Sequence, residues 1–196
     1  MPSAESLTAV RLESERLVLE PLRPQHADEL APVLDDHSLH RFIGGEPLGL
    51  EDLRARFEHQ ARGRSPDGRD WWLNWVVRER STGRPVGTVQ ATVSGLESES
   101  ESATAASTPT PTPTATATAT GSVSELAWVI GTAHQGRGFA KEAVAAVASW
   151  LGECGVSRLR AHIHPDHEAS TAVARSVGMV LCDVVVDGEV RWESSH

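Results

Sequence analysis

The sequence predicts an α/β (α+β) fold: a mixed, mostly antiparallel sheet of six to seven strands, flanked by helices, with one βαβ crossover. Three observations indicate this class. Strand-like and helix-like segments are mixed along the chain instead of forming separate blocks. Turn sequences at 81–85 and 187–188 connect strand-like segments and indicate hairpins. A glycine-rich turn at 131–138 leads from a strand-like segment into an amphipathic helix, which is typical of a crossover.

The first predicted element is a strand at 16–20, where apolar and polar residues alternate. Two helices follow at 26–34 and 51–62, because apolar residues recur there at helical spacing. Residues 40–50 contain glycines and a proline, which predicts a loop between the two helices.

The rest of the chain supplies most of the sheet. A helix is predicted at 139–153, where an apolar stripe ends at Gly155, and another at 169–177, which ends at Gly178. A run rich in aromatic and β-branched residues predicts a strand at 71–78. Further strands are predicted at 86–93, 124–130, 158–163, 180–186 and 189–192. The crossover joins the strand at 124–130 to the strand at 158–163.

The length of 196 residues suits a single domain, 1–196, since domains usually hold about 100–200 residues. Residues 97–122 differ from the rest because they contain only Glu, Ser, Ala, Thr, Pro and one glycine. Without large apolar side chains such a segment has nothing to bury against a core. We therefore expect a low-complexity, disordered insertion between two strands.

The net charge of −9 argues against non-specific binding to nucleic acid or to an anionic membrane, since both require basic patches. No apolar run is long enough to span a bilayer, and the first residues do not form a signal peptide. The two cysteines, Cys154 and Cys182, do not make a disulfide framework. We expect a soluble, cytoplasmic protein.

The glycine-rich turn favours binding of an anion. Glycines allow several backbone N–H groups to point in one direction, and the amino terminus of the following helix adds a partial positive charge. Arg137 and Lys141 can add more charge. A phosphate or pyrophosphate would suit this turn, although a tight turn that only packs the helix is an equal alternative on this evidence.

The surrounding motifs resemble the GNAT superfamily of N-acetyltransferases. Gln135-x-x-Gly138-x-Ala140 is similar to its acetyl-CoA signature, and the strand at 125–130 is similar to the strand before that signature. The segments at 164–170 and 178–179 resemble later family motifs. Residues 15–22 (ERLVLEPL) resemble the opening of the ribosomal-protein N-acetyltransferase (RimJ/RimL-type) branch.

The resemblance implies acetyl-CoA as co-substrate. In the family, backbone amides of the turn hold the CoA pyrophosphate, and the preceding strand, which splays from its parallel neighbour, pairs with the pantetheine arm. Carried over, the cofactor-binding residues are Trp128, Val129, Ile130, Gln135, Gly136, Arg137, Gly138, Phe139, Ala140, Lys141, His167 and Ser170.

Acetyl transfer to a primary amine requires a base for the amine and a proton for the leaving thiolate. Glu125 matches the family position of a glutamate base, although an exposed carboxylate at a strand end is an equal alternative. Many relatives use a tyrosine as the acid, but this chain has none and carries Ala174 there. Ser170, Ser176 or water could then protonate the thiolate, or the thiolate could leave unassisted. His167 stands where the family has asparagine.

The acceptor is expected to be a protein N-terminus or a small-molecule amine. The family builds its acceptor site between the first two helices, where this chain has His40, Arg41 and Phe42. Trp72 is a further candidate, although strand aromatics lie more often in a core. A homodimer is compatible with the resemblance, because sheet edges and the final hairpin could pair.

Two other functions stay open at this stage. The missing tyrosine and His167 allow a non-catalytic acyl-CoA-binding regulatory module. Residues 162–167 (HIHPDH) match the HxHxDH zinc signature of metallo-β-lactamase-fold hydrolases, and imidazole and carboxylate groups suit zinc. That fold needs further ligands downstream, and only His196 follows among the histidines. We therefore expect no metal.

Overall fold

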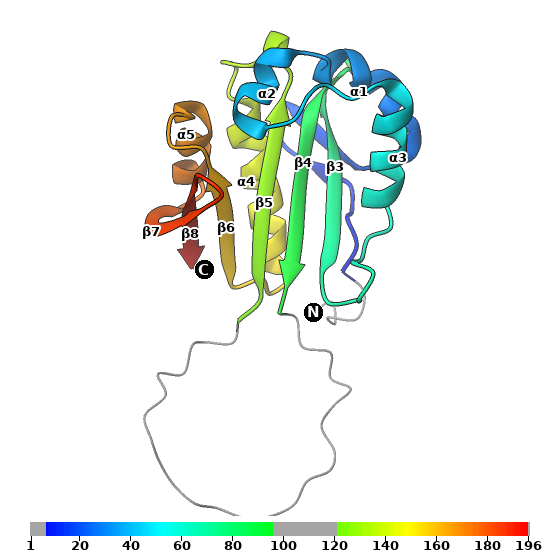
Figure 1. Ribbon diagram of the computed structural model, residues 1–196. Helices are drawn as coiled ribbons and strands as arrows, with labels where there is room; N and C mark the ends of the chain where they lie inside the picture. Colours follow the sequence, from blue (N-terminus) through cyan, green and yellow to red (C-terminus); the bar gives the residue numbers. More distant parts are fainter. Residues whose placement is uncertain (1–6, 96–120, 196) are drawn as a thin grey trace, which may run out of the picture.

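The computed structural model describes residues 7–95 and 121–195, which contain one eight-stranded sheet in the order β1-β2-β3-β4-β5-β6-β8-β7. Only β5 and β6 are parallel, and every other pair is antiparallel. The predicted mixed, mostly antiparallel sheet with one crossover is confirmed (Figure 1). The strands are β1 Leu12–Glu13, β2 Leu17–Pro21, β3 Trp71–Glu79, β4 Pro85–Ser94, β5 Val123–Ile130, β6 Arg158–Ile163, β7 Val180–Val186 and β8 Glu189–Ser195.

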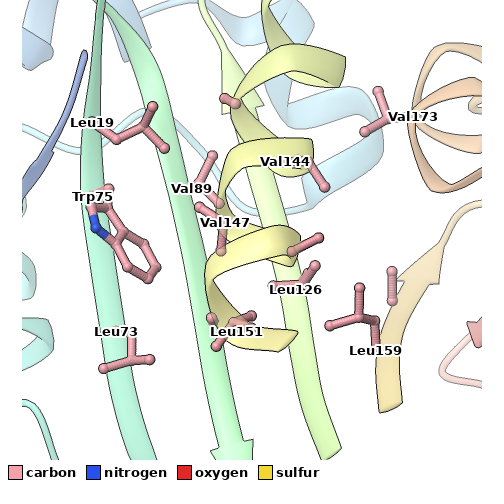
Figure 2. Packing of buried hydrophobic residues seen from close by; sticks show 14 of the residues in the cluster. Leu19, Leu73, Trp75, Val89, Leu126, Val144, Val147, Leu151, Leu159 and Val173 are labelled. Atoms are coloured by element: carbon pink, nitrogen blue, oxygen red, sulfur yellow. The ribbon is translucent and has the colours of Figure 1, made fainter. Parts of the chain in front are cut away.

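Helices cover both faces of this sheet. On one face, α4 packs the stripe Val144, Val147 and Leu151 against inward-facing strand residues such as Leu126 (Figure 2). On the other face, α1 and α3 pack against Val76 of β3. Each such side chain stabilises the fold by roughly 1.5–3 kcal/mol when fully buried. The helices are α1 Ala27–Leu34, α2 His37–Ile43, α3 Leu50–Gln60, α4 Phe139–Glu153 and α5 Glu168–Ser176, with short 3-10 turns η2 Pro24–His26 and η3 Thr132–His134.

Two elements differ from the sequence prediction. The predicted loop at 40–50 begins inside α2, whose amino terminus is capped by Asp36 accepting a hydrogen bond from the Ser38 amide at 2.8 Å. The helix is only about two turns long and is followed by Gly44, so its apolar pattern is too short to recognise. The eighth strand, β1, is only two residues long and exists through its pairing with β2.

The parallel strands β5 and β6 separate along their length. Their register runs only from Val123 to Glu125 of β5, although β5 continues to Ile130 and β6 to Ile163. Beyond Glu125, the edge of β5 that faces β6 therefore has no strand partner in the described residues. The splay that the family resemblance implied is present at this place.

The predicted insertion at 97–122 lies outside the described residues except for its last two positions. Ser122 is buried, its hydroxyl donates to the Gly155 carbonyl at 3.1 Å, and its own carbonyl accepts from Ser157 and Arg158. These two positions are thus part of the folded domain. Ser94 and Val123 pair across β4 and β5, so the ends of the insertion lie side by side.

Large apolar side chains are exposed on the edge strand β7, at Val180, Leu181, Val184, Val185 and Val186. The homodimer expected from the sequence stays a prediction. Within the described ranges, no helix combines the length and apolar character needed to cross a membrane.

Candidate functional site

The glycine-rich turn connects the end of β5 to α4. Gly136 and Gly138 have φ of 73° and 80°, a left-handed conformation that glycine adopts without steric cost. Gly138 is the residue before the first turn of α4, and the Gln135 side chain donates to the Ile130 carbonyl at 2.9 Å. The two glycines and this hydrogen bond bend the chain tightly around the amino terminus of α4.

Backbone amides of this turn are available to a ligand. Within the described chain, the N–H groups of residues 136–141 have no hydrogen-bond acceptor, whereas the next amide, Glu142, bonds to the Gly138 carbonyl at 3.2 Å. The first N–H groups of a helix lack partners in the helix itself and lie at the positive end of its dipole. The turn therefore fits the pyrophosphate of a nucleotide cofactor.

A cavity of about 600 Å³ opens in front of these amides. It is bordered by the end of β5, the turn, the start of α4, and residues of α2 and α5. We call it the cofactor cavity. Its lining includes eleven of the twelve predicted cofactor residues: Trp128, Val129, Ile130, Gln135, Gly136, Gly138, Phe139, Ala140, Lys141, His167 and Ser170.

Arg137 is the exception. Its guanidinium forms an ion pair with Glu79 of β3 and lies 4.3 Å from the centre of the Phe139 ring. The side chain is therefore engaged away from the cofactor cavity, in contrast to the expectation that it adds charge to the anion site.

The splayed edge of β5 also offers hydrogen-bonding groups. The Gly131 amide donates to the Val86 carbonyl at 2.9 Å, which makes these two residues a hydrogen-bonded pair of the antiparallel ladder. Such pairs alternate, so Val129 bonds to Thr88 on β4, and the backbone groups of Trp128 and Ile130 point toward β6. The Ile130 carbonyl already accepts from Gln135, so an extended ligand can add to β5 through the backbone groups of Trp128 and the N–H of Ile130.

A second cavity of about 510 Å³ lies on the other side of the splay. We call it the acceptor cavity. It is bordered by α2, the loop after α2, α3, β4, β5 and β6. The two cavities share the lining residues Leu39, Phe42, Trp128, Val129, His167 and Ser170, so they meet beside the splayed part of β5.

Glu125 lines the acceptor cavity and not the cofactor cavity. Its side chain is about half exposed, and one carboxylate oxygen lies 3.4 Å from Nδ1 of His162 on β6. The Nε2 atom of His162 accepts from the Arg191 side chain at 3.4 Å. Because Nε2 is an acceptor, a neutral His162 carries its proton on Nδ1 and points it toward Glu125.

His162 and His164 are cavity residues that the sequence analysis did not assign to the site. Their alternation on β6 was visible in the sequence, but it was interpreted only as part of a metal motif. In the described residues, no three His, Cys, Asp or Glu side chains converge to hold a metal ion. The HxHxDH-like spacing is thus produced by a strand that passes into a turn, and it does not gather ligands.

The predicted acceptor residues lie in different places. His40 lines the acceptor cavity, Arg41 lines the cofactor cavity, and Phe42 lines both. Trp72 lines neither cavity, and its ring packs against His59 with centroids 4.8 Å apart. Trp72 therefore packs against α3 and does not line the acceptor cavity.

His167 precedes α5 and stacks on Phe42 of α2, with ring centroids 4.2 Å apart and planes 15° from parallel. Burial lowers the pKa of His167, and nearby His164 adds to this effect, so the imidazole is neutral at neutral pH. The stack connects α2 to α5 at the junction of the two cavities.

Ser170 lies within α5 at this junction, and it is buried. Ala174, at the position of the family tyrosine, is fully buried and lines neither cavity. Of the α5 residues at the junction, Ser170 alone carries a hydroxyl that could donate a proton there.

The amino terminus of α2 is connected to the turn. Asp36 accepts a 2.6 Å hydrogen bond from the Thr132 hydroxyl. This bond, together with those from Ser38, lowers the pKa of Asp36 to about 2. The carboxylate is therefore charged across the physiological range, and α2 stays connected to the cofactor turn.

Comparisons with known proteins show that the chain is similar to acetyltransferases. The family model described as "Acetyltransferase (GNAT) domain" matches residues 16–180. The comparison with curated proteins gave no match. Among solved structures, an acetyltransferase from Agrobacterium tumefaciens is 20% identical, with a TM-score of 0.67 and full coverage of both chains.

Two further solved structures are of enzymes described as acetyltransferases of a ribosomal protein. The acetyl transferase from Salmonella typhimurium that modifies the N-terminal serine of L7/L12 has a TM-score of 0.68 at 12% identity, covering 95% of this chain and 99% of that one. A RimL L7/L12 acetyltransferase in complex with coenzyme A has a TM-score of 0.67 at 14% identity, covering 95% and 98%. At these identities the likeness establishes the fold.

Proposed function

The chain belongs to the GNAT acetyltransferase family and uses acetyl-CoA, and from that premise we propose that it transfers the acetyl group to a primary amine, with Glu125 as the base. The acceptor is a protein N-terminus or a small-molecule amine. The observation that carries this proposal is the meeting of the two cavities beside the splayed part of β5, with Glu125 lining only the acceptor cavity.

The turn and β5 hold the donor in this proposal. The amides of residues 136–141 bind the pyrophosphate, and the backbone groups of Trp128 together with the Ile130 N–H bind the extended arm. Acetyl-CoA supplies the activated acetyl thioester. A backbone N–H of the splayed edge, at Trp128 or Ile130, polarises the thioester carbonyl as in an oxyanion hole.

The acceptor amine loses a proton as it gains the acetyl group, and the leaving thiolate gains one. Glu125, oriented by His162, takes the proton from the amine directly or through water. A water molecule can bridge the two because Glu125 lies about 10 Å along β5 from Trp128, where the thioester is bound. The Ser170 hydroxyl or a water molecule donates the proton to the thiolate. The two proton transfers thus occur on the two sides of the junction.

The charge of the acceptor cavity supports an amine substrate. Its lining includes Glu46, Glu125 and Glu189 but only one arginine, Arg56. A cationic ammonium group is attracted to such a cavity, and it must lose a proton before it can attack. The structural neighbour from Salmonella typhimurium, which modifies the N-terminal serine of L7/L12, favours a protein N-terminus as one acceptor class.

Release of CoA from acetyl-CoA with a panel of small amines and of peptides with free N-termini tests this function. We expect turnover with at least one acceptor and a mass increase of one acetyl group on it. Glu125→Gln should lower kcat by about 100-fold or more, while acetyl-CoA affinity changes less than about twofold. The matched control is Glu153→Gln, an exposed carboxylate at the end of α4.

Tight acetyl-CoA binding without turnover on any acceptor would instead favour a non-catalytic acyl-CoA-binding module. Unchanged kcat in Glu125→Gln, with turnover present, would show that Glu125 is not the base.

A further inference from the structure

Arg16, the residue before β2, makes contacts with the cofactor turn that its place in the chain did not indicate. One guanidinium nitrogen donates to the Arg137 carbonyl at 2.9 Å, inside the turn. The Nε and Nη2 atoms bind one carboxylate oxygen of Glu142, on the first turn of α4, each at 2.7 Å. The backbone N–H of Arg16 binds the other oxygen of Glu142, also at 2.7 Å.

The bond to the Arg137 carbonyl determines how the next peptide group is oriented. In a trans peptide the C=O and the following N–H point in opposite directions. Because the Arg137 carbonyl points to Arg16, the Gly138 N–H points away from Arg16. Gly138 lines the cofactor cavity, and a Cβ atom there would lie 3.5 Å from Arg16. Arg16 thus contacts the turn directly from behind.

Arg16 also compensates a charge that would oppose an anionic ligand. Burial alone would raise the pKa of Glu142, but hydrogen bonds from the Arg16 backbone, the Ser14 hydroxyl and the Arg16 guanidinium outweigh it and lower that pKa. Glu142 is therefore a carboxylate within one turn of the free amides. Without a cation beside it, this carboxylate would repel a phosphate at the helix terminus.

We propose that Arg16 is a positioning residue that presets the cofactor turn for the pyrophosphate of acetyl-CoA by holding the Arg137 carbonyl and neutralising Glu142. The inference rests on the proposed function only in taking the turn as the pyrophosphate site. Arg16 touches neither the thioester nor the acceptor. Arg16 therefore affects how tightly a donor with a pyrophosphate binds, and it does not affect the transfer of the acetyl group.

The test compares acetyl-CoA with S-acetylpantetheine, a donor that lacks the pyrophosphate. Arg16→Met should weaken acetyl-CoA binding about tenfold or more in calorimetry, because the Glu142 carboxylate then has no cation beside it and the Arg137 carbonyl is no longer held. Binding of S-acetylpantetheine should change less than about twofold. Arg16→Lys should recover part of the loss, because it restores the charge but not the fork of donors.

Arg11→Met is the matched control, since Arg11 is an exposed arginine that pairs with Glu13 and Glu20 and lines neither cavity. It should bind both donors like the unmodified protein. The proposal is overturned if Arg16→Met binds acetyl-CoA normally, if both donors lose affinity equally, or if Arg11→Met has the same effect. If Arg16→Met does not fold, unchanged acetyl-CoA affinity in Arg16→Lys overturns it.

These binding measurements need no acceptor. They remain decisive if no amine is turned over, so failure of this inference and failure of the proposed function are distinguishable.

Discussion

Replacing Gly87 of β4 with alanine should destabilise the protein, although the change is small. Gly87 pairs with Ile130, and a Cβ atom there would lie 2.9 Å from the Ile130 Cα and closer still to the Val129 carbonyl oxygen. Its φ is not in the left-handed region, so alanine can adopt the backbone conformation. The cost comes from the lack of space beside the β5 backbone and the Ile130 side chain.

The magnitude follows from the geometry. The β5 backbone must recede by about one ångström or more at the Val129 carbonyl to reach ordinary van der Waals contact, and it is fixed in the middle of the ladder. Overpacking of this kind costs about 1–3 kcal/mol, and weakening one ladder hydrogen bond adds about 1 kcal/mol. We expect a loss of about 2–4 kcal/mol, or a decrease in Tm of about 4–16 °C.

Gly152→Ala is the matched control. Gly152 lies in α4, is exposed, and has no atom within 4 Å of its ideal Cβ position. There the same added methyl group should stabilise the fold by about 0.4–1 kcal/mol, because it restricts the unfolded chain. Urea unfolding of both variants, with acetyl-CoA calorimetry on Gly87→Ala, makes the comparison. Stability of Gly87→Ala within about 0.5 kcal/mol of the parent would refute the reasoning.

Two other predictions concern the junction and the insertion. The free energy of unfolding should fall less on acidification in His167→Asn than in the parent protein. The pKa of His167 is lowered in the folded state, so below about pH 6.5 the unfolded chain binds more protons than the folded one. The parent therefore loses stability in that range, and the variant lacks this contribution. Tm at about pH 8 and about pH 5.5 measures this, with His59→Asn on α3 as control, and an identical pH dependence in parent and variant would contradict it. Replacement of residues 96–120 by an Asn-Gly turn should preserve both the fold and acetyl-CoA binding. Gly95 and Gly121 are close in space, since a Cβ atom at Gly95 would lie 3.6 Å from the Gly121 carbonyl oxygen, and a two-residue turn can therefore connect them. Circular dichroism and calorimetry test this, and unfolding on deletion would show that the insertion is structural.

The turn at 131–138 could be predicted from sequence because its chemistry is local. Positive φ at Gly136 and Gly138 and free amides at the start of α4 depend on residues next to one another in the chain. The same holds for α4, whose apolar stripe matches the buried residues of the helix. In these segments, residue type and spacing alone set the conformation.

The helix α2 and the roles of side chains at the site depended on tertiary contacts. Trp72 and Trp75 lie on one strand, but only Trp75 faces the main core and lines the acceptor cavity. Arg137 has the charge that an anion site needs, yet Glu79, far away in sequence, engages its side chain. A pattern in the chain gives the face of a strand but not the partner that a long side chain finds there.

Apart from β1 and α2, the sequence by itself determined the order of strands and helices, together with the position of the crossover and the glycine-rich turn, since each follows from periodicity and glycine placement within a short segment. Only the tertiary structure decided that β5 and β6 part after Glu125, that two cavities meet there, and that Arg16 contacts the turn from behind. The physical reason is that these features arise between segments: Arg16 and Arg137 are 121 positions apart. Contacts over such a separation exist only once the whole sheet has assembled.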